Sequence, residues 1–206
     1  MKKYILLCLL LATMGVNALG QVRLGLRGGA VTSVYQFEEE MIDGLLVRPV
    51  SGSQMGYQLG LVLRLTVPNL IHIQPEINVS SRDYDFTIDG PDGIYPRGRV
   101  AVKRLEMPVT AGINLGPLRL FAGPVFILSQ SQETNLKNMY GLDVAFDDSD
   151  VALVAGIGLD AKQFFVDIRY TTFRDNPTAL YSHYNQTQPV RTTKDFTVQY
   201  SVGFFF

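Results

Sequence analysis

The sequence lacks the residue types on which most thiol, metal and histidine chemistry depends. Its 206 residues include one cysteine, two histidines and no tryptophan. One cysteine cannot close a disulfide within the chain, and two histidines without further cysteines do not make up a zinc site. No Gly-x-Ser-x-Gly element, phosphate-binding loop or dinucleotide fingerprint occurs in the chain. We therefore expect no catalytic residue, no bound metal and no cofactor.

Charged residues are scarce and nearly balanced in sign. They make up 18% of the chain and leave a formal net charge of −1, whereas ordinary globular chains carry ~25% charged residues. A chain without a basic excess attracts phosphate backbones weakly, so nucleic acid is not an expected partner. Ten tyrosines and twelve phenylalanines exclude the composition of a disordered chain.

Long apolar runs are confined to the N-terminal segment. Two lysines precede the apolar residues 4–16, and small residues follow at Ala18 and Gly20. This order is typical of a Sec signal peptide, and the run is too short to span a bilayer comfortably. We expect cleavage after Gly20, with cleavage after Ala18 as the alternative. Residues 1–20 are then a signal peptide, and residues 21–206 form one exported, cysteine-free domain.

Apolar residues alternate with polar or small residues through most of the exported part. Phe196, Val198 and Tyr200, for example, alternate with threonine, glutamine and serine. Side chains of a strand point alternately to opposite faces, so this pattern predicts strands with one apolar and one polar face, and no stretch keeps a helical period. We predict eight strands, near residues 22–35, 54–66, 70–86, 98–114, 118–130, 150–161, 164–173 and 195–206.

The predicted connections are short at one end of the strands and long at the other. Tight turns are expected at 68–69, 116–117 and 162–163, and long polar connections at 36–53, 87–97, 131–149 and 174–194. This arrangement is typical of an eight-stranded antiparallel up-and-down β-barrel, with both termini at the short-turn end. Proline removes a ladder donor inside a strand, so we expect bulges at Pro75, Pro108 and Pro124.

The two faces of the strands decide which side of the barrel meets water. The apolar face carries large residues and almost no charge, whereas the other face carries arginines, carboxylates and many glycines. A narrow lumen needs small residues beside large ones, and arginine pairs with carboxylates in bidentate geometry. We therefore predict a transmembrane barrel with lipid outside, instead of a soluble barrel, and a closed polar network inside. The expected network residues are Arg23, Arg27, Arg64, Glu76, Arg104, Glu106, Arg119, Asp160, Asp167 and Arg169.

Aromatic residues gather near the predicted strand ends, where lipid barrels place aromatic girdles. The expected girdle residues are Tyr57, Tyr84, Phe86, Phe164, Tyr170, Phe173, Phe196, Phe204 and Phe206. The last strand has Tyr200, Val202, Phe204 and Phe206 at alternate positions. This ending resembles the C-terminal signal by which outer-membrane barrels are recognised, so we expect the barrel-assembly machinery as a partner.

Several segments together resemble the PorT-like group of outer-membrane β-barrel domains from Bacteroidota. The similar segments are residues 22–29, 104–109, 121–124, 154–159 and 166–170, together with the closing aromatic strand. The resemblance covers essentially all of residues 21–206 and implies an eight-stranded barrel in the cell outer membrane. We expect both termini, which lie at the short-turn end, to face the periplasm. It does not fix a function, because only some members of the group relate to type IX protein secretion.

Four functional interpretations remain open from the sequence. The first is a non-enzymatic outer-membrane protein whose long surface loops, above all 174–194 with Tyr181, His183 and Tyr184, bind partners. The second is an accessory component of a type IX-like secretion or transport system that binds other envelope proteins. The third is a narrow channel or ligand-binding barrel. The fourth, a hydrolase using Ser182 and His183, lacks a strand-borne third residue.

Overall fold

The structure is a computed structural model. It describes residues 21–37, 40–42, 45–49, 54–67, 70–90, 93–94, 98–134, 142–147, 151–173, 178–183 and 186–206. The expected signal peptide lies outside these residues. Among the described residues, no helix is long and apolar enough to cross a membrane.

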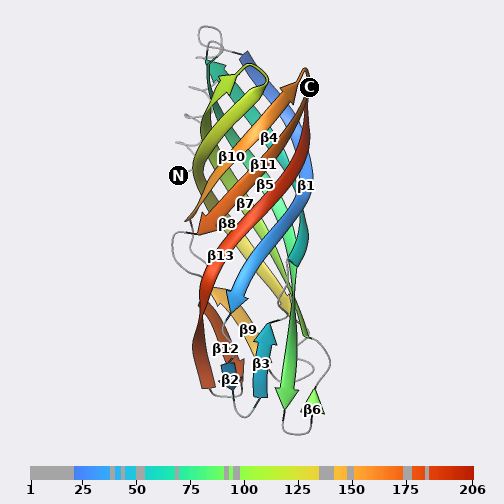
Figure 1. Ribbon diagram of the computed structural model, residues 1–206, viewed down its shortest axis with the longest axis vertical. Helices are drawn as coiled ribbons and strands as arrows, with labels where there is room; N and C mark the ends of the chain where they lie inside the picture. The colour runs from blue at the N-terminus through green and yellow to red at the C-terminus, as the bar shows by residue number, and fades with distance from the viewer. Residues whose placement is uncertain are drawn as a thin grey trace, which may run out of the picture.

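Eight long strands form a closed antiparallel barrel (Figure 1). They are β1 (Gln21–Phe37), β4 (Gln54–Val67), β5 (Ile71–Gly90), β7 (Gly98–Leu115), β8 (Leu118–Thr134), β10 (Val151–Ala161), β11 (Phe164–Phe173) and β13 (Gln186–Phe205). Each strand pairs with the next in this order, and β1 also pairs with β13, which closes the sheet. The predicted up-and-down barrel is confirmed.

Glycine allows β1 to approach β13 where the barrel closes. The two strands pair antiparallel from Gly25 opposite Phe205 onwards. A Cβ atom added to Gly25 would clash with the carbonyl oxygen of Phe204, and one added to Gly29 would clash with that of Tyr200. These inward positions therefore need glycine because the neighbouring backbone lies where a side chain would begin.

The tight turns at 116–117 and 162–163 are present as predicted, whereas residues 68–69 lie outside the described part of the chain. Gly116 and Lys162 occupy the first central position of their turns, with φ of +65° and +59°. A positive φ at this position is typical of a type II′ hairpin turn, whose twist matches that of the flanking strands. Gly116 adopts it freely, whereas Lys162 adopts a conformation that costs an L-residue energy.

Short strands extend the barrel wall beyond its long-connection end (Figure 1). β2 (Glu40–Ile42) pairs with β3 (Leu45–Pro49), and β3 and β6 (Gly93–Ile94) pair with β5. β9 (Leu142–Asp147) pairs with β12 (Thr178–His183), which pairs with β13. The sequence predicted loops in these stretches. They form strands because β5 and β13 continue past the predicted limits and offer free edges on which even polar residues pair.

Prolines interrupt the ladders that surround them. The β5–β7 pairing passes from Pro75 opposite Val109 to Asn78 opposite Glu106 without intervening pairs. The β7–β8 register shifts between Leu105 and Glu106, two residues from Pro108, because β8 carries one extra residue there. The extra residue is Leu128 of β8, so the bulge lies on the strand opposite β7 and not at Pro108, and the described pairings show no register shift at Pro75 or Pro124.

Side chains alternate strictly between the two faces of the wall. In β11, Phe164, Val166 and Ile168 are exposed on the outside, whereas Asp167 and Arg169 are buried inside. The outward face is apolar from position 57 to 67 of β4 and from 105 to 115 of β7, which matches the ~9–11 residues of a transmembrane β-strand. Other exposed outward residues include Leu24, Leu26, Ile73, Ile77, Val79, Leu120, Leu153, Ile157 and Val202.

Candidate functional site

Seven charged side chains form one chain of alternating sign inside the barrel. In order they are Arg64, Asp160, Arg119, Asp167, Arg169, Glu76 and Arg27. Asp160 accepts from Arg64 Nη1 and Arg119 Nε, both at 2.8 Å. Asp167 accepts from Arg119 Nη2 at 2.6 Å and from Arg169 Nη2 at 2.8 Å. Every carboxylate in the chain thus lies between two guanidinium groups.

Glu76 is the most highly connected member of this chain. Arg169 donates to both carboxylate oxygens, from Nη1 at 3.0 Å and from Nη2 at 2.6 Å. Arg27 Nη1 and Gln74 Nε2 donate at 2.6 Å, and Asn78 Nδ2 donates at 3.1 Å. The Glu76 residue is 2% exposed, so its charge is balanced by these donors instead of by water.

The network connects strands that are far apart in sequence. Its charged members come from β1, β4, β5, β8, β10 and β11. Arg27 also donates to Ser201 Oγ of β13 at 2.7 Å, and Thr110 of β7 donates to the Gln74 carbonyl at 3.3 Å. Every strand of the barrel therefore contributes a side chain to one set of contacts across the lumen.

Aromatic rings fill the lumen at the short-turn end. Phe165 and Phe205 form a buried cluster with Val62, and their ring centroids are 4.8 Å apart. The Arg64 guanidinium lies over both rings, 4.5 Å from the Phe205 centroid and 5.1 Å from that of Phe165. Sequence reasoning missed these two phenylalanines, although each has the inward parity of its strand and follows an outward phenylalanine.

Phe121 supports the middle of the charged chain in a similar way. The guanidinium of Arg169 lies 5.0 Å from the Phe121 centroid and that of Arg119 lies 5.6 Å from it. His72 is completely buried and meets Phe121 edge-on, with 6.4 Å between the ring centroids. The aromatic faces thus cover the sides of the guanidinium groups that the carboxylates leave open.

A second, smaller polar cluster lies beyond an apolar layer. Val125, Ala152 and Val154 form this layer together with Phe173. On its far side, Arg82 lies 3.4 Å from Glu106, and Arg104 donates to Gln130 at 2.6 Å and lies 5.1 Å from the Phe173 ring centroid. Phe173 was expected in the outer girdle, and that prediction is wrong because its parity in β11 turns it inward.

The structure separates the ten residues that the sequence grouped together. Arg27, Arg64, Glu76, Arg119, Asp160, Asp167 and Arg169 belong to the alternating chain, and Arg104 and Glu106 belong to the second cluster. Arg23 lies at the rim, where it donates to Gln21 Oε1 at 2.9 Å, and it pairs with no carboxylate among the described residues. Arg82 was missed, although it shares the parity of Glu76 in the same strand.

The lumen is packed at the level of the charged chain. Arg27, Arg64, Arg119 and Arg169 are at most 2% exposed, and Asp167 is fully buried. Side chains that line a water-filled channel would remain accessible to water. An eight-stranded barrel is just wide enough for its interior to be filled by side chains, and the described residues fill it in this way.

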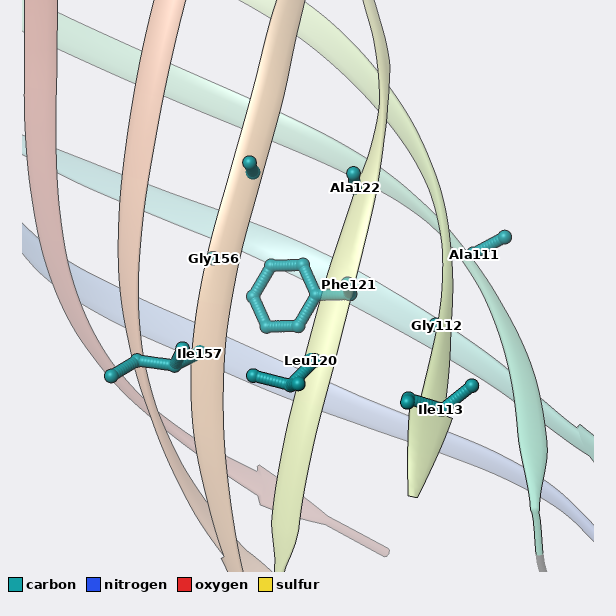
Figure 2. Close-up of a pocket in the computed structure, with 9 residues that line it drawn as sticks. Ala111, Gly112, Ile113, Leu120, Phe121, Ala122, Gly156 and Ile157 are labelled. Atoms are coloured by element: carbon teal, nitrogen blue, oxygen red, sulfur yellow. The ribbon is translucent and has the colours of Figure 1, made fainter. Parts of the chain in front are cut away.

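A shallow hollow in the outer wall is lined by apolar groups (Figure 2). Ala111, Ala122 and Ala155 pair in register across β7, β8 and β10, and larger residues such as Leu120 and Ile157 flank them. The hollow has a volume of about 550 Å³ and is lined almost wholly by carbon. The hollow forms because the outward side chains at its centre are small alanines. It faces outward together with the rest of the apolar wall.

A closed antiparallel barrel with a continuous apolar exterior and an ion-paired interior defines an integral membrane β-barrel protein. Residues 15–172 match the family model of the outer membrane protein beta-barrel domain, and the chain belongs to this family. The barrel therefore sits in the lipid of an outer membrane. The match does not distinguish the PorT-like group within the broader family.

Two solved structures share the fold at low sequence identity. The outer membrane protein OprG from Pseudomonas aeruginosa is 11% identical with a TM-score of 0.55, over 93% of this chain and 99% of that chain. The outer membrane protein AlkL, solved in lipid bilayers, is 9% identical with a TM-score of 0.53, over 92% of each chain. A search of curated protein sequences found no match. These likenesses concern the fold alone.

Proposed function

We propose that this protein is a non-enzymatic outer-membrane anchor that presents the extended end of its barrel to partners outside the cell. One observation carries the proposal: the lumen is closed by ion pairs while the wall continues past its apolar part. The last outward apolar position of β5 is Val79, yet the strand runs to Gly90. Strand segments that project beyond the lipid are not needed to cross the membrane, so we assign them to contact with partners.

Exposed ion pairs support this boundary of the lipid-facing wall. Arg99 Nη2 lies 3.5 Å from Asp83 Oδ2, and Lys103 Nζ lies 2.7 Å from Glu133 Oε1. These residues occupy outward positions just beyond the apolar ones and are largely exposed. Charged groups on the outside of a barrel belong at or above the headgroup level, because charge on the lipid face is costly at the bilayer midplane.

We further propose that the short-turn end and both termini face the periplasm. Tyr200, Val202 and Phe206 of the last strand are exposed on the outer wall, and Phe204 packs between Phe164 and Phe206 at centroid distances of 5.1 and 5.9 Å. This outward row supports recognition of the last strand by the barrel-assembly machinery.

The packed lumen argues against the narrow channel and the ligand-binding barrel. A role as an accessory of a type IX-like secretion system rests on the PorT-like resemblance. In that role, the same extended end or the periplasmic end would contact another envelope protein.

Neither the charged chain nor the aromatic cluster offers a nucleophile with an activating base, which supports the non-enzymatic assignment.

Single cysteines test the orientation. The chain has no cysteine apart from Cys8 of the expected signal peptide, so S182C at the extended end and Q163C in a short turn are matched reporters. A membrane-impermeant maleimide added to intact cells should label S182C, and Q163C should be labelled only after the outer membrane is opened. Labelling of Q163C alone in intact cells would overturn the proposal.

A further inference from the structure

Two basic residues lie side by side at the rim of the short-turn end. Lys162 belongs to the turn between β10 and β11, and Arg23 lies near the start of β1. Arg23 Nη1 donates to the Lys162 carbonyl oxygen at 3.4 Å, although 139 positions separate the two residues in the sequence. In the part of the chain that the structure describes, neither side chain forms an ion pair with a carboxylate. Their positive charges are therefore available to a partner from outside the chain.

The backbone of Lys162 indicates that its side chain has a use. Lys162 has φ of +59°, and Gly116 has φ of +65° at the same place in the turn between β7 and β8. Glycine adopts a positive φ freely, whereas any other L-residue is strained there. Residues held in such conformations concentrate at ligand contacts and other functional positions. A lysine in this turn therefore indicates a bound group of opposite charge.

An aromatic patch, made of Phe164, Phe204 and Phe206, lies on the outer wall beside this rim. The ring centroid of Phe204 is 5.1 Å from that of Phe164 and 5.9 Å from that of Phe206. Phe164 and Phe206 are largely exposed, and the paired residues Val166 and Val202 continue the exposed apolar surface along the same two strands. Cations at a rim above an apolar wall follow the order in which a phospholipid places its phosphate above its acyl chains.

The rim lies at the boundary of the apolar wall and not far beyond it. Exposed apolar residues continue up to the short turns at this end, among them Leu115, Leu118 and Phe164. The strands stop at these turns, in contrast to the long extensions at the other end. Charge on the outside of a barrel costs little at the membrane interface, although it is costly at the bilayer midplane. Lys162 and Arg23 therefore suit the level of the lipid headgroups.

A phospholipid fits these features better than a protein segment does. The phosphate of a headgroup complements the two cations, and the acyl chains below it match the aromatic patch. An acidic protein segment would meet the cations and leave the aromatic patch without a partner of its own. A headgroup with an amine would bring a third positive charge close to Lys162 and Arg23, so an anionic headgroup such as that of phosphatidylglycerol fits best.

We infer that Lys162 and Arg23 hold the phosphate of an anionic phospholipid whose acyl chains lie against the aromatic patch. The Lys162 ammonium and the remaining N–H groups of the Arg23 guanidinium donate charge-assisted hydrogen bonds to the phosphate oxygens. Arg23 is held in place for this role, because its Nη2 donates to Gln21 Oε1 at 2.9 Å and its guanidinium lies 5.9 Å from the Phe205 ring centroid. The inference goes beyond the proposed function: it needs the short-turn end to lie at a membrane surface but not to face the periplasm.

Native mass spectrometry of the purified protein in detergent micelles, titrated with phosphatidylglycerol, tests the site. We expect one lipid to bind ahead of all others, and about tenfold weaker binding of that lipid to the K162Q/R23Q double variant, since two charge-assisted contacts are lost. Phosphatidylcholine, whose headgroup carries a positive charge, should bind the wild type about tenfold more weakly. The matched control R99Q/K103Q removes two cations that pair with Asp83 and Glu133 at the other end, and it should bind like the wild type.

The single variant K162G separates the side chain from the fold. Glycine relieves the backbone of the turn, so this variant should be at least as stable as the wild type. It should nevertheless bind phosphatidylglycerol about threefold more weakly, because one of the two cations is lost. Unchanged lipid binding by K162G would contradict the role that we assign to Lys162.

Equal binding of phosphatidylglycerol by the wild type and K162Q/R23Q would overturn the inference, because the aromatic patch alone would then hold the lipid. Equal binding of phosphatidylglycerol and phosphatidylcholine would overturn it for the same reason. Displacement of the lipid by an equal concentration of inorganic phosphate would mean that the cations bind a free ion, which also overturns it. Labelling of Q163C tests the proposed orientation separately: its labelling in intact cells would remove the proposed function and leave the lipid titration unaffected.

Discussion

Glu76 balances two buried arginines inside the barrel and connects them to Gln74 and Asn78. Removal of one partner from such a group leaves a charge in a place that water does not reach. An unpaired buried charge destabilises the fold by more than the intact ion pair stabilises it. Both charges of the pair lose their hydration on burial, and only their mutual attraction offsets that loss. At the scale of single residues, Glu76 is therefore the position where the closed lumen is most sensitive to change.

Glu76→Ala should lower the free energy of unfolding by about 3–5 kcal/mol, since Arg27 then keeps only Ser201 as a polar partner among the described residues. Glu76→Gln should lie between this variant and the wild type, because the amide keeps the shape and one acceptor. Urea unfolding in detergent micelles measures the difference. It can be followed by tyrosine fluorescence or by the shift in gel mobility between the folded and the heat-unfolded barrel. Glu133→Gln breaks an exposed pair and should change little; an equal loss in both variants would contradict the account.

Lys162 carries a left-handed backbone at the first position of its turn, with φ of +59°. Lys162→Gly should raise the stability by up to about 1 kcal/mol, because relief of the left-handed strain exceeds the entropy cost of glycine. The turn is on the surface, so the same unfolding assay reports this effect without a change in packing. Gln163→Gly is the matched control and should be neutral or destabilising, and a gain there equal to that of Lys162→Gly would refute the turn assignment.

At the scale of elements, the two faces of the last strand have different roles. Phe206 is 70% exposed on the outer wall, whereas Phe205 is 2% exposed and packs on Phe165 under Arg64. The final strand thus carries an outward row of aromatic and aliphatic residues and an inward ring that closes the lumen. We expect substitutions on the two faces to affect different properties of the protein.

Phe205→Ala should cost about 3–5 kcal/mol of stability through the cavity that it leaves, and it should still reach the outer membrane in reduced amounts. Phe206→Ala should keep the stability of the folded barrel and lower the amount assembled in cells. Unfolding of the purified barrels and quantification of membrane fractions measure the two properties. A loss of stability in Phe206→Ala equal to that of Phe205→Ala would contradict this division.

The alternating pattern predicted the eight barrel strands to within a few residues at most ends, because each strand has one apolar and one polar face. It did not predict β9 or β12, since their pairing depends on the far longer extension of β13 and has no local signature. Arg82 was within reach of the same parity rule that selected Glu76. The partners within the lumen could not be predicted, because they depend on the stagger of eight strands around the barrel.

At the scale of the whole molecule, the charged chain, the aromatic cluster and the apolar layer close the lumen at successive levels. Six of the eight strands supply the charged chain, so none of these six can move away without breaking an ion pair. Under the proposed function, the barrel is a rigid support in the lipid, and its extended end presents the surfaces that partners contact. A conducting pore would require water beside side chains that are at most 2% exposed, such as Arg27, Arg119 and Arg169.

Planar-bilayer recording of the purified wild-type protein tests this closed lumen most directly. The account predicts no steady conductance above the bare bilayer at either polarity, and the appearance of open events in Glu76→Ala would show that inserted protein was present. Stable, ohmic conductance of the wild type that scales with the number of inserted molecules would contradict the account.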